Sequence, residues 1–482
     1  MRTILLIIYF LILVYTVIRI LLDTESTPKT LAYLIMVFAV PVFGIILYVS
    51  FGINYRHQSS NTRGMRAQKE MDDLFLKETA DETEKLLQIH HKDINHYIPL
   101  VHFLNGIARE RLSRNYFKLL VNGEEKFPEV LRVLETAQKF IHMEYYDWEN
   151  DVRGNQIKDV LLRKSGEGVK VRVLYDDYAS RKIKRNIVRE LKNGGVAIYP
   201  KIRLMVRQFA SRVNHRDHRK AIIVDGKVGF IGGINISDRY DNSVDTGLYW
   251  RDTHLRITGP LVLNVQRHFI VSWNSCKATE KLSFNRNLFP ESPPVTKDGI
   301  EGLGQVVVGG PIYPMSNIML SYTRIFMLAQ KKLYITNPYF IPSESIRDAL
   351  KQAALSGVDV RLIVPEKSDS IIVGAASRFY FNELLEAGVR IFLYNKGFIH
   401  AKTVVADSQL SVVGTANMDI RSFDLNFEIM SIIYGQEFAE VLESVFEKDL
   451  EECREVNIYD WNSIGIIPRL SFATARLISY FL

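Results

Sequence analysis

Two stretches of the sequence carry the same polar residues at the same spacing. They are "HRKAIIVDGKVGFIGGIN", residues His218–Asn235, and "HAKTVVADSQLSVVGTAN", residues His400–Asn417. Each places His first, Lys third, Asp eighth and Asn last. Residues i and i+2 of an extended strand share a face, so His218 and Lys220 point the same way. Lys supplies a fixed positive charge and His a nucleophile or proton carrier near neutral pH, which together suit chemistry on a phosphate.

The repetition of the motif is its strongest signal. A lone His near a Lys on a strand is more often a structural residue, whereas two copies at identical offsets favour a paired catalytic site. Asp225 and Asp407 fall at the turn of a predicted hairpin, where we expect them to brace the motif rather than contact phosphate. The Asn amides can donate to phosphate oxygens. The predicted catalytic residues are His218, Lys220, Asp225, His400, Lys402 and Asp407, and the predicted phosphate-binding residues are Asn235 and Asn417.

Strand and helix patterns alternate in both halves of the chain. Residues 139–148 predict a strand that is followed by a helix and a further strand, and the second half repeats this order with a strand at 332–340 and a helix at 343–357. Repeated strand–helix–strand units predict parallel sheet covered by helices, and two similar units indicate an internal duplication. About eleven extra residues, 203–213, precede the first motif and fit either a flap near the site or an ordinary loop insertion.

The first 55 residues differ from the rest of the chain. Ile4–Ile18 carries no charge before Arg19, and residues 31–55 are uncharged throughout. Segments of this length predict two membrane-spanning helices, with a cleaved signal peptide as the alternative for the first. Pro41 and Gly44 leave a kinked or re-entrant second pass open.

The distribution of charge and cysteine limits the partners. The formal net charge is +7, which favours an anionic partner such as a membrane surface, a phospholipid headgroup or nucleic acid. Basic residues follow the second apolar segment at Arg56, Arg63, Arg66 and Lys69, so we expect both chain ends, and with them the catalytic part, on the cytoplasmic side of the cell membrane. The two cysteines exclude a disulfide scaffold or a cysteine metal cluster, and no metal or cofactor is expected.

The doubled pattern H-x-K-x4-D-x6-G-x-x-N resembles that of the phospholipase D superfamily. "FIHMEYYDW", "TNPYFIPSESIRDALKQAALSGVDVRLIVPEKSDS" and "GTANMDIRSFDLNFE" are similar to segments of its bacterial cardiolipin synthase family. The resemblance implies an α/β fold of two duplicated lobes, each a mixed sheet flanked by helices, packed as a pseudo-dimer. The expected parts are two transmembrane segments (1–55), a helical linker (56–115), the first lobe (116–300) and the second lobe with an amphipathic C-terminal tail (301–482).

The resemblance also implies a reaction. A phosphatidyl group passes from one phosphatidylglycerol to another through a covalent phosphohistidine, giving cardiolipin and glycerol. By family analogy His218 is the nucleophile and His400 the acid and base. An acidic residue downstream of each motif would orient its histidine, which assigns Asp252 to the first half and Glu428 to the second. The implied partners are phosphatidylglycerol, cardiolipin and the lipid bilayer, without nucleic acid, and a homo-oligomer is compatible with the sequence.

Several other interpretations remain open at this stage. Water or another alcohol as acceptor would make the protein a phospholipase or a headgroup-exchange enzyme. A nuclease fits the motifs and the charge but not the apolar N-terminal segments, and two intact motifs argue against a scaffold without activity. The C-terminal "IGIIPRLSFATARLISYFL" predicts either an interfacial helix or a helix docked on the core. A literal "HKD" at 91–93 lies in a polar helical stretch and lacks the strand spacing, so we do not expect it in the site.

Overall fold

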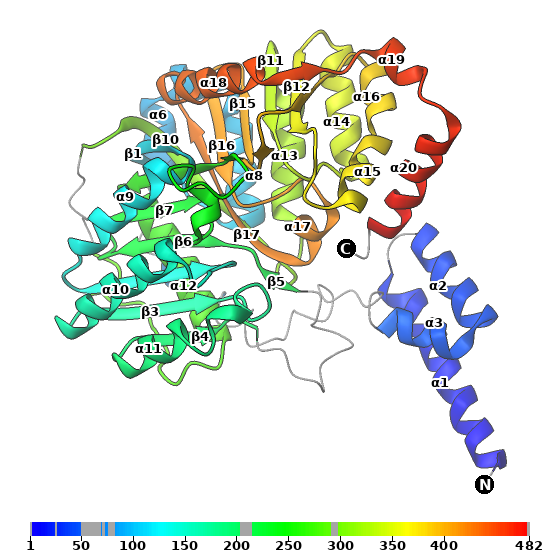
Figure 1. Cartoon of the computed structure of the whole chain (residues 1–482), viewed down its shortest axis with the longest axis horizontal. Helices are drawn as coiled ribbons and strands as arrows, with labels where there is room; N and C mark the ends of the chain where they lie inside the picture. The colour runs from blue at the N-terminus through cyan, green and yellow to red at the C-terminus, as the bar shows by residue number, and fades with distance from the viewer. Residues whose placement is uncertain are drawn as a thin grey trace.

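The chain folds around one long mixed β-sheet with helices on both faces (Figure 1). This computed structural model describes residues 2–24, 27–49, 69, 73–75, 82–202, 215–290 and 297–479. The strands lie in the order β18-β13-β12-β11-β15-β16-β17-β10-β1-β9-β7-β6-β2-β3-β4. Apart from β18, this order is mirrored about the contact between β10 and β1. Two copies of one unit, joined edge to edge, produce such an order.

Each lobe combines a parallel part with an antiparallel part, and β1 joins β10 antiparallel at the centre. The strands of the first lobe are β1 (Ser113–Val121), β2 (Phe140–Tyr145), β3 (Lys170–Tyr175), β4 (Ala197–Pro200), β6 (Lys220–Val224), β7 (Val228–Gly232) and β9 (Thr253–Thr258). Those of the second lobe are β10 (Ile300–Gly309), β11 (Lys332–Thr336), β12 (Asp359–Pro365), β13 (Arg390–Tyr394), β15 (Thr403–Ala406), β16 (Leu410–Gly414), β17 (Asn426–Tyr434) and β18 (Cys453–Glu455).

The helices follow the strands as the sequence predicts. The predicted helix at 343–357 forms as α14, because the Ser343 side chain accepts the Ile346 N–H at its start and Gly357 takes a left-handed φ of 90° after its end. The first lobe has α9 (Asn122–Glu135), α10 (Val152–Gly166), α11 (Ile187–Asn193) and α12 (Leu261–Ser275). The second lobe has α13 (Asn317–Leu328), α14 (Glu344–Leu355), α15 (Ile371–Phe379), α16 (Phe381–Glu386), α17 (Ile420–Asp424), α18 (Gln436–Glu451), α19 (Ile458–Asn462) and α20 (Ile466–Ser479).

The hydrophobic core on one face of the sheet runs through both lobes. Helices α12 and α18 cover this face, and Phe117 of β1 contacts Phe438 of α18 with ring centroids 5.8 Å apart. On the other face each lobe has its own core, under α9–α11 in the first and under α13, α14 and α16 in the second. The shared core fixes the two lobes relative to each other, which the site between them requires.

The lead-in helices pack on the second lobe. They are α6 (Glu82–Ile89), α7 (His91–Ile94), a 3₁₀ turn at Asn95–Tyr97 and α8 (Ile98–Ala108), and α8 contacts β10 and α13. The literal "HKD" at 91–93 begins α7 and does not line the cleft described below. The predicted insertion at 203–213 lies outside the described residues.

Only the first of the two apolar segments forms a long helix. Within the described residues, α1 (Arg2–Asp23) is the one helix long and apolar enough to cross a membrane. The second segment is divided into α2 (Thr27–Ala39) and α3 (Pro41–Leu47). Pro41 lacks the N–H that would continue α2, and Gly44 packs so closely on α2 that a Cβ would lie 2.5 Å from the Met36 backbone. The prediction of a second spanning helix is therefore wrong, because the described part of the second segment forms two short helices packed as a hairpin.

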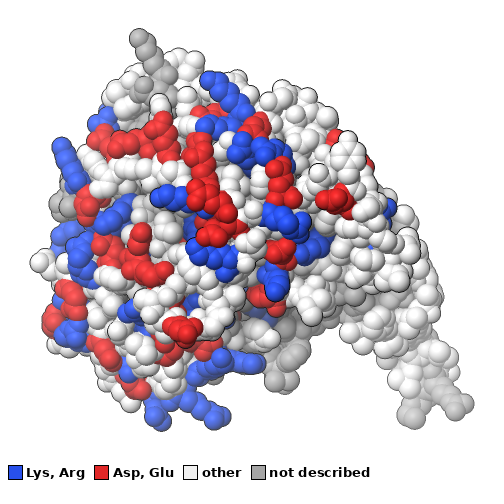
Figure 2. Space-filling model, turned by 45° about the horizontal axis from the view of Figure 1, so that its top comes forward, with Lys and Arg blue, Asp and Glu red and all other residues white. Residues whose placement is uncertain are grey.

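The hairpin of α2 and α3 begins after the C-terminal end of α1 and returns the chain to that same end. The Tyr48 hydroxyl, just after α3, donates a hydrogen bond to the Asp23 carboxylate at the C-terminal end of α1 (3.2 Å). Charged side chains of both signs are mixed over the body, whereas the side where α20 and the N-terminal helices lie in Figure 1 is mostly uncharged (Figure 2).

This hairpin predicts that the N-terminus and the catalytic body lie on opposite sides of the membrane. Single cysteines would be introduced by Thr3→Cys and Lys69→Cys in a background with Cys276 and Cys453 replaced by Ser. A membrane-impermeant maleimide added to intact cells should label one of the two and not the other. Two full membrane passes would place both cysteines on the same side, and equal labelling would contradict the hairpin.

Candidate active site

Each repeated motif forms a β-hairpin whose aspartate anchors the neighbouring strand. The first hairpin, β6–β7, turns at Asp225, and the second, β15–β16, at Asp407, both with φ of 54°. The Asp225 carboxylate accepts the backbone N–H groups of Gln138, Lys139 and Phe140 at 2.8–2.9 Å, at the start of β2. Asp407 accepts the equivalent N–H groups of residues 330–332 before β11. Both aspartates therefore brace the sheet, as their place at the turn predicts, and neither lines the cleft described below.

The two histidines face each other across the boundary between the lobes, and each is held by a carboxylate of the opposite lobe. His218 Nδ1 lies 2.9 Å from Glu428 Oε1, and His400 Nδ1 lies 2.7 Å from Asp252 Oδ2. The expected pairing of each histidine with the acid of its own half is therefore wrong. The pairs cross between the lobes. Because each carboxyl group contacts Nδ1, Nε2 is the ring nitrogen that remains for chemistry.

Short exchanged strands explain why the pairs cross. Strand β5 (Arg216–Asp217) of the first lobe adds parallel to β17 of the second, and β14 (Phe398–Ile399) of the second lobe adds parallel to β8 (Trp250–Arg251) of the first. The histidine after each added strand is tied down by its own backbone: His218 N–H donates to the Phe427 carbonyl (3.0 Å), and the N–H of His400 donates to the Arg251 carbonyl (2.7 Å).

Strand register makes Asp252 and Glu428 equivalent despite their unequal spacing in the sequence. His254 lies opposite Gly232 in one lobe and Met430 opposite Gly414 in the other, and each acid stands two residues earlier. The motif position after this glycine accommodates the difference in length between the Asp252 and Glu428 side chains. A Cβ on Gly233 would lie 2.0 Å from Asp252 Oδ1, whereas the Thr415 hydroxyl, at the same motif position, donates to Glu428 Oε2.

The two buried imidazole–carboxyl pairs differ in charge. Burial, assisted by Lys402, lowers the pKa of His400 to about 4, and burial, Lys220 and Lys402 lower the pKa of His218 well below its usual value. Burial alone would raise the pKa of Asp252, but the contacts with His400 and Lys402 outweigh it and lower that pKa. Burial raises the pKa of Glu428 to about 8. Both rings are thus neutral at rest, and His400 has the more firmly ionised partner.

The two motif lysines lie directly beneath the histidines. Lys220 Nζ donates to the His218 carbonyl (2.9 Å) and Lys402 Nζ to the His400 carbonyl (2.5 Å). Burial lowers the pKa of Lys220 to about 8 and that of Lys402 to about 7, while Asp252 and Glu428 oppose this effect. An ammonium group has three N–H donors, so each lysine keeps donors for a phosphate oxygen.

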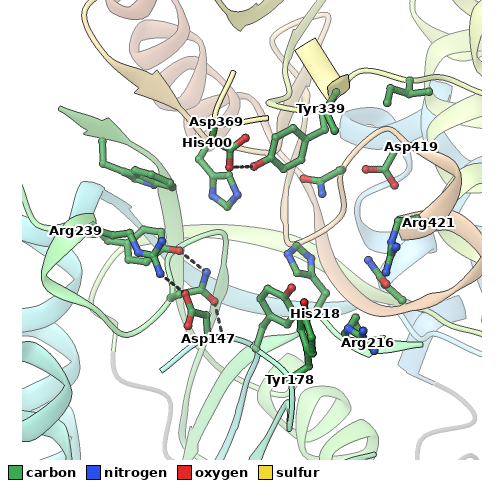
Figure 3. Close-up of a pocket in the computed structure, with 18 of the residues that line it drawn as sticks. Asp147, Tyr178, Arg216, His218, Arg239, Tyr339, Asp369, His400, Asp419 and Arg421 are labelled. Atoms are coloured by element: carbon green, nitrogen blue, oxygen red, sulfur yellow. Dashed lines mark hydrogen bonds and ion pairs between the residues drawn. The ribbon is translucent and has the colours of Figure 1, made fainter. Parts of the chain in front are cut away.

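The histidines line one cleft of about 600 Å³ between the lobes (Figure 3). Asn235 and Asn417 also line it, as predicted. The Asn235 amide donates to the Tyr240 hydroxyl (2.7 Å), and among the described residues Asn417 Oδ1 accepts no hydrogen bond. No group of three or more His, Cys, Asp or Glu side chains able to hold a metal ion occurs within the described ranges.

Sequence reasoning named Tyr146 and Tyr339 as core or pocket wall and, apart from the motif residues, missed the rest of the cleft wall. Aromatic rings surround the histidines: Tyr146 lies 4.7 Å from His218, and Trp250 lies 5.4 Å from His400, measured between ring centroids. Polar pairs complete the wall, namely Asp147 with Arg239 (2.6 Å) and Tyr339 with Asp369 (2.6 Å), together with Tyr178, Arg216 and Arg421. Arg216 and Arg421 carried a signal, because they stand two residues before the first His and four after the second Asn.

Comparison with known sequences gives the family. Residues 130–273 and 322–450 match the family described as "Cardiolipin synthase, PLD-like domain". The chain belongs to this family. It is 35% identical to "Probable cardiolipin synthase YwiE" of Bacillus subtilis, over 98% of this chain and 92% of that one, and 37% identical to "Cardiolipin synthase 2" of Bacillus anthracis, over 95% and 88%. Solved structures extend the likeness in fold beyond this family.

The fold also occurs in more distant proteins. Phosphatidylserine synthase of Haemophilus influenzae superimposes with a TM-score of 0.54 at 17% identity, covering 76% of this chain and 93% of that one. Polyphosphate kinase of Porphyromonas gingivalis gives a TM-score of 0.50 at 13% identity, covering 81% and 56%. At such identities the likeness concerns the fold alone. It shows that the mixed α/β architecture of this chain also occurs in these two proteins.

The anchoring role of Asp225 predicts a loss of stability. In Asp225→Ala three N–H groups at the start of β2 lose their acceptor, so the free energy of unfolding should fall by about 2–4 kcal/mol. Thermal unfolding in detergent would measure this, with the exposed Asp159→Ala as the control that leaves the midpoint unchanged. An Asp225→Ala protein that keeps its melting temperature but has lost all turnover would contradict the bracing role.

Proposed function

We propose that the protein is a cardiolipin synthase, which transfers a phosphatidyl group from one phosphatidylglycerol to another and releases glycerol. The observation that carries the proposal is that the histidines and asparagines of both motifs line one cleft, in a chain of the cardiolipin synthase family. A phosphodiester resists attack because its oxygens are anionic. Two lysines and two asparagines around one phosphate can offset that charge as it builds in the transition state.

The first half of the reaction would form a covalent intermediate. Nε2 of His218 attacks the donor phosphorus, the bond from phosphorus to the glycerol oxygen breaks, and His400 gives that oxygen a proton. An approaching anionic phosphate opposes the effect of Lys402 and raises the pKa of His400, so the ring can carry this proton when donor is bound. In the second half His400 takes the proton from a hydroxyl of the acceptor phosphatidylglycerol, whose oxygen displaces His218 from phosphorus.

The difference between the two carboxyl groups supports this assignment of roles. The acid and base must carry a proton before the first step and again after the second, and the firmly ionised Asp252 stabilises that imidazolium at His400. The nucleophile must stay unprotonated, and burial together with Lys220 and Lys402 keeps the pKa of His218 low. Asp252 and Glu428 thus act as positioning residues, each for the histidine of the opposite lobe.

We also propose that the cleft works at the membrane surface, with the catalytic body on the cytoplasmic side as the basic residues at 56–69 favour. Helix α20 packs on α15, which contributes Val373 to the cleft, so the C-terminal helix is docked on the body. Its outer side nevertheless exposes Ile466, Ile467 and Leu470. An apolar side next to the cleft, on the same side of the molecule as the N-terminal helices (Figure 1), suits a bilayer that delivers both lipids laterally. The mirrored lobes would act as the two halves of a pseudo-dimer, and we leave the number of chains in the assembly open.

A direct assay tests the transfer reaction. Purified protein in mixed vesicles would receive phosphatidylglycerol labelled in the headgroup glycerol. We expect cardiolipin and free labelled glycerol, both lost in His218→Ala and in His400→Ala. Phosphatidic acid as the sole lipid product would contradict the proposal and indicate a hydrolase.

The covalent intermediate predicts different fates for the two histidine variants. With a phosphatidyl donor whose leaving group is p-nitrophenol, departure needs no proton, so His400→Ala should accumulate an acid-labile phosphoenzyme and His218→Ala should form none. Mass spectrometry after a short incubation would detect the adduct. An adduct in His218→Ala, absent in His400→Ala, would reverse the assigned roles.

The low pKa of Lys402 predicts an alkaline limb in the pH profile. Below a pH of about 7 the free enzyme has Lys402 protonated, and its charge is lost as the pH rises through that value. With the p-nitrophenyl donor, whose leaving group needs no proton from His400, the value of kcat/KM should therefore fall above about pH 7. Lys402→Arg keeps the charge and should move this fall upward by at least one pH unit, at a lower maximal rate. An unchanged alkaline limb in that variant would exclude Lys402 as its cause.

A further inference from the structure

The two lobes bring two arginines together beside His218. Arg216 lies in β5, two residues before His218, and Arg421 lies in α17 of the other lobe. Both line the cleft, and Figure 3 draws them on the same side of it. Of the three labelled aspartates, Asp147 and Asp369 lie across the cleft from them, and Asp419 lies on their side, next to Arg421 (Figure 3). One side of the cleft thus has an excess of positive charge, and the other side, which also holds Arg239, has an excess of negative charge.

This proximity of like charges has an electrostatic cost. Burial lowers the pKa of Arg421, Asp419 opposes the change, and the positive charge of Arg216 lowers the pKa further. An anion bound between the two guanidinium groups would offset their repulsion. The third arginine of the cleft, Arg239, lies on the other side and forms an ion pair with Asp147 at 2.6 Å.

Arg216 is held in a defined orientation. One of its guanidinium nitrogens donates to the His215 carbonyl (3.0 Å), and the group lies over the Tyr178 ring at 4.6 Å from the centroid. A planar guanidinium keeps further N–H groups in a fork that matches phosphate oxygens. A fixed fork loses less conformational entropy on binding than a mobile lysine would.

The proposed reaction requires two phosphates in the cleft at once. The scissile phosphate lies between the histidines. The acceptor phosphatidylglycerol brings its own phosphodiester, which does not react and is separated from the attacking hydroxyl by a three-carbon glycerol. The second phosphate must therefore lie close to the histidines but outside the His–Lys–Asn groups that hold the first.

We propose that Arg216 and Arg421 form a second phosphodiester site, which binds the intact phosphate of the acceptor lipid and so selects a phospholipid over water or a free alcohol as acceptor. The proposal rests on the proposed function, because it assigns a binding role for the acceptor of that reaction. It also gives a reason for the two arginines to come from different lobes, since this side of the cleft exists only when the lobes are joined.

Two reactions of the same protein distinguish binding of the acceptor phosphate from binding of the scissile phosphate. Cardiolipin formation needs both the scissile and the acceptor phosphate. Exchange of labelled free glycerol into phosphatidylglycerol needs the scissile phosphate alone, since glycerol carries none. We expect Arg216→Gln and Arg421→Gln each to lower the rate of cardiolipin formation at least about tenfold relative to glycerol exchange. Arg239→Gln is the matched control, which should change both rates by the same factor.

The outcomes distinguish this site from its alternatives. If cardiolipin formation and exchange fall by equal factors in both variants, the arginines act on the scissile phosphate or on folding, and the proposal is overturned. It is equally overturned if neither rate changes. Failure of the proposed function looks different, because the wild-type protein would then yield phosphatidic acid and no cardiolipin.

The wild-type protein provides a test that does not depend on folding of the variants. Glycerol and glycerol phosphate at equal concentrations would compete as soluble acceptors for the phosphatidyl group. A second phosphate site predicts at least a tenfold preference for glycerol phosphate, reduced in Arg421→Lys, which keeps the charge but not the fork. Equal use of the two acceptors by the wild-type protein would overturn the proposal.

Discussion

The hydrogen bond between the imidazole of one lobe and the carboxyl group of the other is the interaction on which the site depends. His218 is oriented by Glu428 and His400 by Asp252, so neither lobe alone holds a working histidine. The rest of the structure maintains this arrangement. The exchanged strands β5 and β14 carry each histidine across the boundary, and the core under α12 and α18 prevents the lobes from sliding. A fused duplication thus gives one active site rather than two.

Burial of charge makes the site suited to phosphate chemistry. Two lysines, two carboxyl groups and two imidazoles lie almost wholly out of water, where an anionic substrate interacts strongly with fixed cations. In the proposed mechanism, small differences between the lobes give the two histidines different roles. Gly233 leaves room for the short, ionised Asp252, whereas Thr415 supports the longer Glu428, whose pKa is raised. Equivalent positions in a symmetric frame can thereby serve as nucleophile on one side and as acid and base on the other.

The sequence predicted the local parts of the site but not their assembly. The hairpins and the His–Lys faces follow from spacing along a strand, which the chain encodes locally, whereas the two acids were assigned from the resemblance to the family. The crossed pairs do not follow from spacing, because spacing within one half says nothing about which lobe supplies the neighbouring strand. Arg216 and Arg421 were missed for the same reason. Hydropathy also counts apolar residues without regard to the break at Pro41, so the second spanning helix was predicted and is absent from the described structure.

Crossed pairing is tested most directly by disulfide trapping. In a background with Cys276 and Cys453 replaced by Ser, Asp252→Cys would be combined either with His400→Cys or with His218→Cys and oxidised. Strand register places residues 399 and 251 side by side, so the first pair should form a disulfide, found by mass spectrometry as a peptide containing residue 252 joined to one containing residue 400. Cross-linking of residue 252 to residue 218 instead would contradict the account.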